Sequence, residues 1–376
     1  MAEDVILVDE LAAGPERIIA VATLNLPSSL NALNLPLIDR LSELLLRWQH
    51  DPRVVCVVLQ GAGGKAFCAG GDVRFLYNAA RQSRQQGDAY SAVCADFFTR
   101  EYALDYRIHT YPKPVLCLGH GIVMGGGLGL MIGASHRVVT DRTRVAMPEI
   151  TIGLFPDVGA TYFMPRLVGK TGLYIALTGT RMSGADCVYA GLADCRLNAE
   201  QLPGLLQELS GLPWSLIDRA HNDAVLSALL TQKSQNVAPE VSQLEEHLPY
   251  IEAVCAGGDL RSFTARMHAA LPCDEWTMAG KKTFLGGSPS SAALIFAQEA
   301  KGRAISLADA FRFELSLATQ CTAHPDFVEG VRALLIDKDQ RPSWHPATID
   351  DLSDASVAAY LAPLWSDEAH PLRSLT

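Results

Sequence analysis

The chain has 376 residues, of which 49% are hydrophobic and 19% are charged, and its formal net charge is −10. This composition is typical of a globular chain that is long enough for one large domain or two smaller ones. The acidic balance and the absence of a Lys/Arg run exclude a general nucleic-acid-binding role. No apolar run approaches the roughly 20 residues that span a bilayer, which argues against a membrane protein.

The nine cysteines are scattered and form no C-x-x-C pair. Because their number is odd and their spacing irregular, we expect reduced thiols in the core, without a disulfide framework or a metal site. The start at residues 1–4 is acidic, whereas secretory and organellar leaders are basic. We therefore expect a cytoplasmic protein.

The first 60 residues predict a β-hairpin, a helix and a buried strand. Apolar runs at 5–8 and 18–24 flank a turn at Gly14-Pro15. Five apolar residues then recur at helical spacing, namely Leu37, Leu41, Leu44, Leu45 and Trp48. The continuous apolar run at 54–59 favours a strand buried on both faces in a parallel arrangement.

Further strand and helix units follow up to about residue 200. We expect a helix near Val73 that the polar stretch 81–87 interrupts, and a second helix at about 90–108. Strands are expected at 115–118 and 136–140. Beyond residue 200 the pattern is helical, apart from a strand-like run at 333–336. The sequence thus predicts an α/β fold, with a core at 1–200 and a helical region at 201–376.

The triple glycine Gly125-Gly126-Gly127 comes shortly after the strand at 115–118, and an apolar helical pattern begins there. The N–H groups in the first turn of a helix are unpaired and carry partial positive charge. Glycines also let a ligand approach the backbone. This arrangement suits an anion or a developing oxyanion. The alternative is close packing of a helix on a strand, which also needs small residues.

Four segments, at 24–33, 66–72, 124–127 and 147–150, together resemble the crotonase (enoyl-CoA hydratase/isomerase) superfamily in order and spacing. Further matches at 61–72, 97–102, 148–159 and 326–344 resemble its 3-hydroxyisobutyryl-CoA hydrolase branch, so the resemblance covers residues 5–350. It implies a spiral of ββα units followed by helices. It also implies hydrolysis of an acyl-CoA thioester in valine degradation, without a separate cofactor, and it leaves a homo-oligomer open.

The resemblance implies that the N–H groups of Gly71 and Gly126 hold the thioester oxygen. Glu149 would attack the thioester or activate water, and Asp157 would orient the water or the substrate hydroxyl. Contacts with the coenzyme A part and the acyl group are implied for Leu30, Ala69, Asp72, Arg74 and Glu101.

Other functions stay open at this point. Gly129 stands where the hydratases have a second glutamate, so two-glutamate water addition lacks one group, but a one-glutamate hydratase or isomerase is not excluded. A non-catalytic coenzyme A-binding protein of the same fold is a third hypothesis. From its neighbours alone, Glu149 is also compatible with a surface turn. Leu26 and Ser28 replace basic residues of the first motif, which weakens the expected grip on the adenosine phosphate end.

Two other reactive patterns are weaker. Cys68 lies beside the oxyanion segment, but any small apolar residue would serve there equally well. Ser135, His136 and Asp141 contain the residue types of a hydrolytic triad. We reject this triad because adjacent residues of a strand point to opposite sides.

Overall fold

The computed structural model describes residues 4–376, so the start at residues 1–3 lies outside the described part. The chain forms two compact units, each made of three segments. The first unit comprises residues 4–71, 104–145 and 182–245, and the second comprises residues 72–103, 146–181 and 246–376. This division differs from the predicted regions 1–200 and 201–376, which stay a prediction.

A six-stranded sheet organises the first unit. Its strands, in spatial order, are β1 (Ile6–Ala12), β2 (Ile18–Leu24), β3 (Val54–Gly61), β5 (Val115–Gly119), β7 (His136–Thr140) and β9 (Cys195–Leu197). β1 and β2 are antiparallel, which confirms the hairpin, and every other pair runs parallel. The first six residues of β3 are all buried, as predicted for a strand covered on both faces.

Three short strands form a second sheet, β4 (Ala66–Cys68), β6 (Ile122–Met124) and β8 (Arg144–Ala146). After each of β3, β5 and β7 the chain enters the next strand of this second sheet. Helices follow β4 and β6, and α4 (Gly126–Ile132) begins in the triple glycine. The predicted α/β spiral of ββα units is confirmed.

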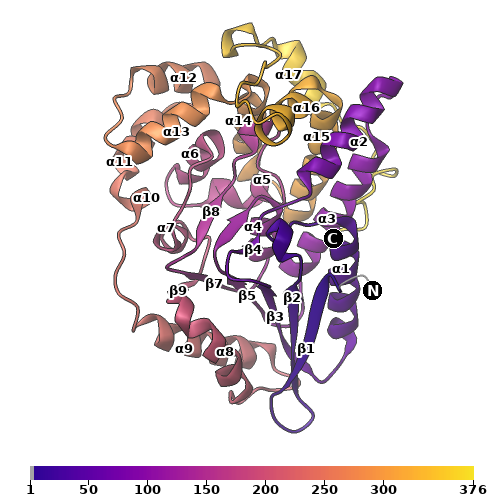
Figure 1. Ribbon diagram of the computed structural model, residues 1–376, viewed down its shortest axis with the longest axis vertical. Helices are drawn as coiled ribbons and strands as arrows, with labels where there is room; N and C mark the ends of the chain where they lie inside the picture. Colours follow the sequence, from indigo (N-terminus) through magenta and orange to yellow (C-terminus); the bar gives the residue numbers. More distant parts are fainter. Residues whose placement is uncertain (1–3) are drawn as a thin grey trace. The chain divides into compact units, whose positions relative to one another are not determined.

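The core of the first unit lies between the large sheet and two helices, α8 (Leu202–Ser210) and α9 (Arg219–Ser234), which lie beside β9 in Figure 1. α1 (Leu35–His50) packs on β1, β2 and β3. The predicted apolar stripe of α1 is at most 1% exposed. Burying a side chain of this size contributes about 1.5–3 kcal/mol. The unit also contains η1 (Pro27–Ser29), α7 (Gly184–Ala190) and η4 (Ala199–Gln201).

The second unit is mainly helical, which confirms the expected helical C-terminal region. Its helices between residues 72 and 181 are α2 (Val73–Gln86), the first part of α3 (Ala92–His109), η2 (Glu149–Ile152), α5 (Ala160–Phe163), η3 (Met164–Arg166) and α6 (Thr171–Thr178). After α10 (Gln243–Glu246) come α11 (Leu248–Val254), α12 (Leu260–Ala269), α13 (Glu275–Gly286), α14 (Pro289–Gly302), α15 (Leu307–Ala323), α16 (Pro325–Val331), η6 (Ile349–Asp351) and α17 (Asp354–Leu361).

Two local predictions are wrong. The run at 333–336 is not a strand but part of a π-helical turn, η5 (Arg332–Ile336), that continues from α16. A short apolar run does not by itself distinguish a strand from a helix. The polar stretch 81–87 does not interrupt α2, which ends only at Gly87 with φ 77°. Its polar residues lie largely on the exposed face of an amphipathic helix.

Between residues 4 and 376, none of the helices combines the length and apolar character needed to cross a membrane.

Candidate active site

The predicted site residues fall into two sets, one in each unit. Leu30, Ala69, Gly71 and Gly126 belong to the first unit, and Asp72, Arg74, Glu101, Glu149 and Asp157 belong to the second.

In the first unit, the segment of Gly71 lies against the segment of Gly126. Gly70 has φ 98°, a backbone conformation that favours glycine. A Cβ atom on Gly70 would stand 2.9 Å from the carbonyl oxygen of Met124 and 3.5 Å from the nitrogen of Gly126. The two segments therefore approach each other through bare backbone, and a side chain at Gly70 would force them apart.

The start of α4 supplies backbone donors. Gly125 precedes the helix with φ 48°, and its carbonyl accepts the N–H groups of Leu128 and Gly129. The N–H of Gly126 occupies the first helical position, where the helix itself offers no acceptor. A partial positive charge at this end favours an anion or a developing oxyanion.

A second close approach joins α4 to β4. A Cβ atom on Gly127 would overlap the carbonyl oxygen of Cys68, so only glycine fits at this position. The Cys68 side chain is fully buried, which does not suit a nucleophile for a substrate from solution.

Leu30 and Ala69 are joined by a backbone hydrogen bond of 3.0 Å, from the Ala69 N–H to the Leu30 carbonyl. Leu30 and Asn31 both adopt left-handed φ values near 55°. The Asn31 side-chain amide stabilises this turn by donating to the carbonyls of Ala62 and Ala66, each at 3.0 Å. The first motif thus fixes the backbone that leads to Gly71.

In the second unit, Asp72 and Arg74 begin α2, and each has a structural partner. The Asp72 carboxylate accepts the N–H of Phe75 at 3.0 Å and so caps the helix. The Arg74 guanidinium donates to the carbonyl oxygen of Leu335, in η5, at 2.8 Å. These contacts are compatible with a binding role, but neither needs a ligand to explain it.

Three buried carboxyl groups gather in the second unit. Glu101, Glu149 and Asp157 are only 3–5% exposed. The Tyr102 hydroxyl donates a hydrogen bond of 2.6 Å to Oδ2 of Asp157. The alternative that Glu149 is a surface turn residue is therefore excluded.

Burial and the charge of Asp157 favour the protonated forms of Glu101 and Glu149. Burial raises the pKa of Asp157 to about 6, although the hydrogen bond from Tyr102 lowers it. Burial, followed by the negative charge of Asp157, raises the pKa of Glu101 and of Glu149 well above the usual range. Carboxyl groups with strongly raised pKa values are common at sites of acid–base chemistry.

The turn that carries Glu149 is held on two sides. Glu149 begins η2, which ends at Gly153 with φ 68°. A Cβ atom on Gly153 would overlap the backbone of Asp326, and Ser288 donates its N–H to the Ile150 carbonyl at 3.0 Å. Among residues 4–376, no hydrogen-bond partner reaches the buried Oε2 atom of Glu149. Buried polar atoms without a partner are rare in proteins, and each one calls for an explanation such as a functional role.

The sequence analysis missed two buried polar residues that hold the segment of Asp157. Glu314, on α15, accepts the N–H groups of Gly159 and Thr161. Gln298, on α14, donates to the carbonyl of Pro156. The available signal was a polar residue on the apolar face of each helix. Glu314 lies among Phe311, Leu315 and Ala318, and Gln298 follows Leu294 and Ile295.

The reason given for rejecting the triad of Ser135, His136 and Asp141 is wrong in one geometric point. Oγ of Ser135 lies 3.0 Å from Nδ1 of His136, so the two side chains do not point apart, because Ser135 precedes β7 rather than belonging to it. The other His136 ring nitrogen lies 2.9 Å from Oγ of Ser227. Asp141 instead accepts the N–H of Ala199. The three residues therefore do not form a triad.

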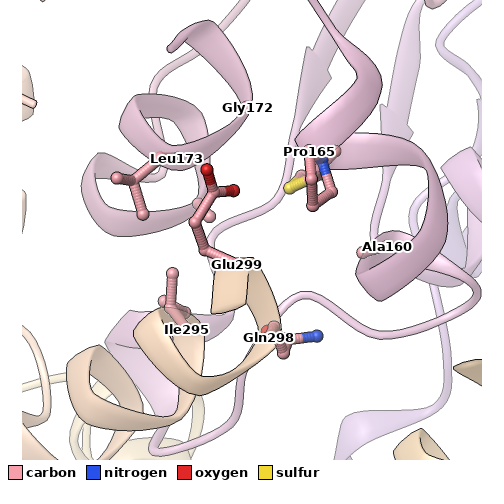
Figure 2. Close-up of a pocket in the computed structure, with 9 residues that line it drawn as sticks. Ala160, Pro165, Gly172, Leu173, Ile295, Gln298 and Glu299 are labelled. Carbon is pink, nitrogen blue, oxygen red and sulfur yellow. The ribbon is translucent and has the colours of Figure 1, made fainter. Parts of the chain in front are cut away.

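Two cavities in the second unit contain none of the candidate residues. The smaller, of about 10 Å³, lies between α5, α6 and α14 and is lined by residues that include Ala160, Leu173 and Gln298 (Figure 2). This volume admits at most one water molecule. The larger, of about 340 Å³, is lined by residues of α13, η5 and the turn at Gln340.

In the described part of the chain, no group of three or more His, Cys, Asp or Glu side chains is arranged to hold a metal ion.

Comparison with known proteins gives concordant results. The sequence model of a family described as enoyl-CoA hydratase/isomerase matches residues 19–361. A Xenopus tropicalis protein named "3-hydroxyisobutyryl-CoA hydrolase, mitochondrial" is 38% identical over 357 residues, which cover 93% of this chain and 87% of that protein.

Two solved structures resemble the whole chain. An enoyl-CoA hydratase from Rhodobacter sphaeroides 2.4.1 has a TM-score of 0.81 and 31% identity, with 96% of this chain and 98% of that one covered. A carnitinyl-CoA dehydratase from Mycobacterium thermoresistibile has the same TM-score and 32% identity, with 96% and 97% covered.

Proposed function

The chain belongs to the enoyl-CoA hydratase/isomerase family, and we propose that it is an acyl-CoA thioester hydrolase. The proposed reaction converts 3-hydroxyisobutyryl-CoA and water to 3-hydroxyisobutyrate and free coenzyme A, a step of valine degradation. The similarity to the Xenopus tropicalis hydrolase over 93% of this chain supports the choice of substrate. The observation that carries the reaction type is the buried cluster of Glu101, Glu149 and Asp157.

In this proposal the N–H groups of Gly71 and Gly126 donate to the thioester carbonyl oxygen as it gains negative charge. A donor of this kind is worth about 10²–10³ in kcat. Two observations support the assignment: the glycine-only approach of the two segments, and the position of Gly126 at the start of α4.

Glu149 is the proposed nucleophile or general base. As a nucleophile, Glu149 gives up its proton and forms a C–O bond to the thioester carbon, the C–S bond breaks, and the leaving thiolate takes up that proton. Water then hydrolyses the resulting anhydride and restores Glu149. As a base, ionised Glu149 takes a proton from the water whose oxygen bonds to the same carbon, the C–S bond breaks, and Glu149 returns the proton to the leaving thiolate. The unpartnered, buried Oε2 atom is compatible with both routes.

Asp157 is proposed to orient the attacking water or the hydroxyl group of the substrate. The hydrogen bond from Tyr102 occupies Oδ2, so Oδ1 is the oxygen assigned to this role. Glu101, whose pKa is raised by burial and then by the nearby charge of Asp157, is proposed to line the acyl pocket.

Leu30, Ala69, Asp72 and Arg74 are proposed to contact the coenzyme A part of the substrate, and no separate cofactor is required. Arg74 would have to exchange its bond to the Leu335 carbonyl for a phosphate. The Xenopus tropicalis relative is named as mitochondrial, whereas a cytoplasmic location for this chain stays a prediction. A homo-oligomer also stays a proposal.

A one-glutamate enoyl-CoA hydratase is the second candidate, because the Rhodobacter sphaeroides structure carries the name of that activity. Gly129, within α4, provides no carboxyl group for the second acid–base role. This difference from the two-glutamate pattern favours hydrolysis.

The deciding experiment measures thiol release from (S)-3-hydroxyisobutyryl-CoA and, in parallel, loss of the enoyl absorbance of crotonyl-CoA. Thiol release without hydration is the expected result. Hydration without thiol release would assign the protein to the second candidate. Loss of both activities, with coenzyme A still bound, would indicate a non-catalytic binding protein. The matched control is Glu149→Gln, which should abolish turnover and leave binding of coenzyme A largely intact.

The two routes for Glu149 are separated by a single turnover in water labelled with oxygen-18. Label in the Glu149 carboxylate is expected for the anhydride route. Its absence would count against the anhydride route.

A further inference from the structure

The segment that carries Asp157 has a strained backbone. Val158 has φ 53° and is 1% exposed, and Gly159 follows with φ 91°. A β-branched residue is unfavourable in the left-handed region of backbone conformation. Such a conformation persists only where the surroundings over-determine it. The contacts that hold residues 156–161 therefore determine where Asp157 points.

Glu314 is hydrogen-bonded to this segment through both of its carboxyl oxygens. Oε2 accepts the N–H of Gly159 and Oε1 accepts the N–H of Thr161, each at 2.7 Å. Glu314 is fully buried. Both bonds are shorter than the usual N–H···O distance of about 2.9 Å. Burying the polar carboxyl group of Glu314 costs free energy unless its oxygens are hydrogen-bonded. The two bonds therefore favour the observed conformation of the segment.

Gln298, on a second helix, is hydrogen-bonded to the same segment. Its Nε2 donates to the carbonyl of Pro156 at 2.7 Å and to Oγ1 of Thr161 at 2.8 Å. These bonds tie both ends of the segment to α14, on either side of Asp157 and Val158. In Figure 2, Gln298 and its neighbour Glu299 leave α14 in different directions. Glu299 instead pairs with Lys170 at 3.1 Å.

We propose that Glu314 and Gln298 are positioning residues of the reaction, which aim the Asp157 carboxylate by holding its strained backbone. The Tyr102 hydroxyl fixes the side chain of Asp157, and the two positioning residues fix the main chain that bears it. A displacement of about 1 Å at a reacting group costs on the order of 10²-fold in rate. The inference rests on the proposed thioesterase function.

The test is Glu314→Gln in the full chain, assayed by thiol release. Glutamine keeps one acceptor but turns its NH₂ group toward the second backbone N–H, so one of the two hydrogen bonds to Gly159 and Thr161 is lost. We expect kcat to fall about 10–100-fold. KM should stay within about threefold, because Glu314 acts on Asp157 through the backbone and does not contact the substrate. The matched control is Glu299→Gln, which removes an ion pair on α14 but no bond to the segment. Its kcat should stay within about twofold.

A double-mutant cycle with Asp157→Asn separates positioning from a general structural role. If Glu314 acts through Asp157, Glu314→Gln should lower kcat little further in the Asp157→Asn background. Equal loss in both backgrounds would overturn the proposal, as would an unchanged kcat or a rise in KM alone. If Glu314→Gln does not fold, Gln298→Met provides the same cycle, because it removes the donors to Pro156 and Thr161.

Amide hydrogen exchange provides a readout that is independent of activity. Exchange at Gly159 and Thr161 should be faster in Glu314→Gln than in Glu299→Gln. Equal exchange would overturn the claim that Glu314 holds these two N–H groups. If the unmodified protein releases no thiol, the proposed function fails while the exchange result still stands.

Discussion

The two sets of candidate residues are built on different physical principles. In the first unit the proposed donors are backbone N–H groups of glycines, in segments packed so closely that a Cβ atom on Gly70 or Gly127 does not fit. In the second unit the proposed catalytic groups are carboxyl side chains, whose protonation depends on burial and, for Glu101 and Glu149, on the charge of Asp157. Steric exclusion between closely packed backbone segments thus fixes the first set, whereas electrostatics and contacts across as many as 155 residues fix the second.

The largest expected effect is in the second set. Glu149→Gln preserves the shape of the side chain but removes the ionisable group, so kcat for thiol release should fall by about 10³-fold. Thiol release in a single turnover measures the loss. Retention of more than about a tenth of the activity would move the catalytic role away from Glu149.

In the first set the comparable change is steric. Gly127→Ala would drive a methyl group into the carbonyl of Cys68, and this backbone contact cannot simply rotate away. We expect a loss of about 3 kcal/mol in the free energy of unfolding, measured by urea denaturation. The matched control is Gly64→Ala, since a Cβ atom there meets nothing within 4 Å and Gly64 has no left-handed φ. Similar losses for both variants would contradict the steric account.

The electrostatic account of the second set predicts how stability depends on pH. Burial raises the pKa of Asp157 to about 6 and that of Glu314 to about 8. Because these folded-state values lie above those of the unfolded chain, the contribution to stability is present below about pH 4 and is lost as the pH rises through 6 to 8.

Urea denaturation at pH 5 to 9 measures this loss, with a slope of at most about 1.4 kcal/mol per pH unit for each carboxyl group. Glu314→Gln should show a smaller decline than the unmodified chain between pH 6 and 8, because glutamine does not ionise. Parallel curves for the two proteins would refute the assignment.

The smallest expected effect is at Tyr102. Tyr102→Phe removes the hydrogen bond that lowers the pKa of Asp157, so that pKa should rise further. We expect kcat to fall about 10-fold, with the acidic limb of the pH–rate profile displaced to higher pH. An unchanged profile would show that Asp157 does not titrate in the rate-limiting step.

Much of the fold could be predicted because its signals are local. The hairpin, the apolar stripe of α1 and the helix that starts in the triple glycine each depend on residues close in sequence, and all three are confirmed. The π-helical turn at 332–336 could not be predicted, because its apolar run is equally compatible with a strand and only its continuation from α16 decides between them.

For the site, the resemblance carried by the sequence motifs pointed to the glycines and the acidic residues, and their roles stay a prediction. It did not reveal that Glu314 and Gln298 hold the segment of Asp157, nor that Tyr102 bonds to its carboxylate. Nor did it reveal how strongly the carboxyl groups hold their protons. Only the tertiary structure decided these points, because a pKa is set by burial and by charges that approach from distant parts of the chain.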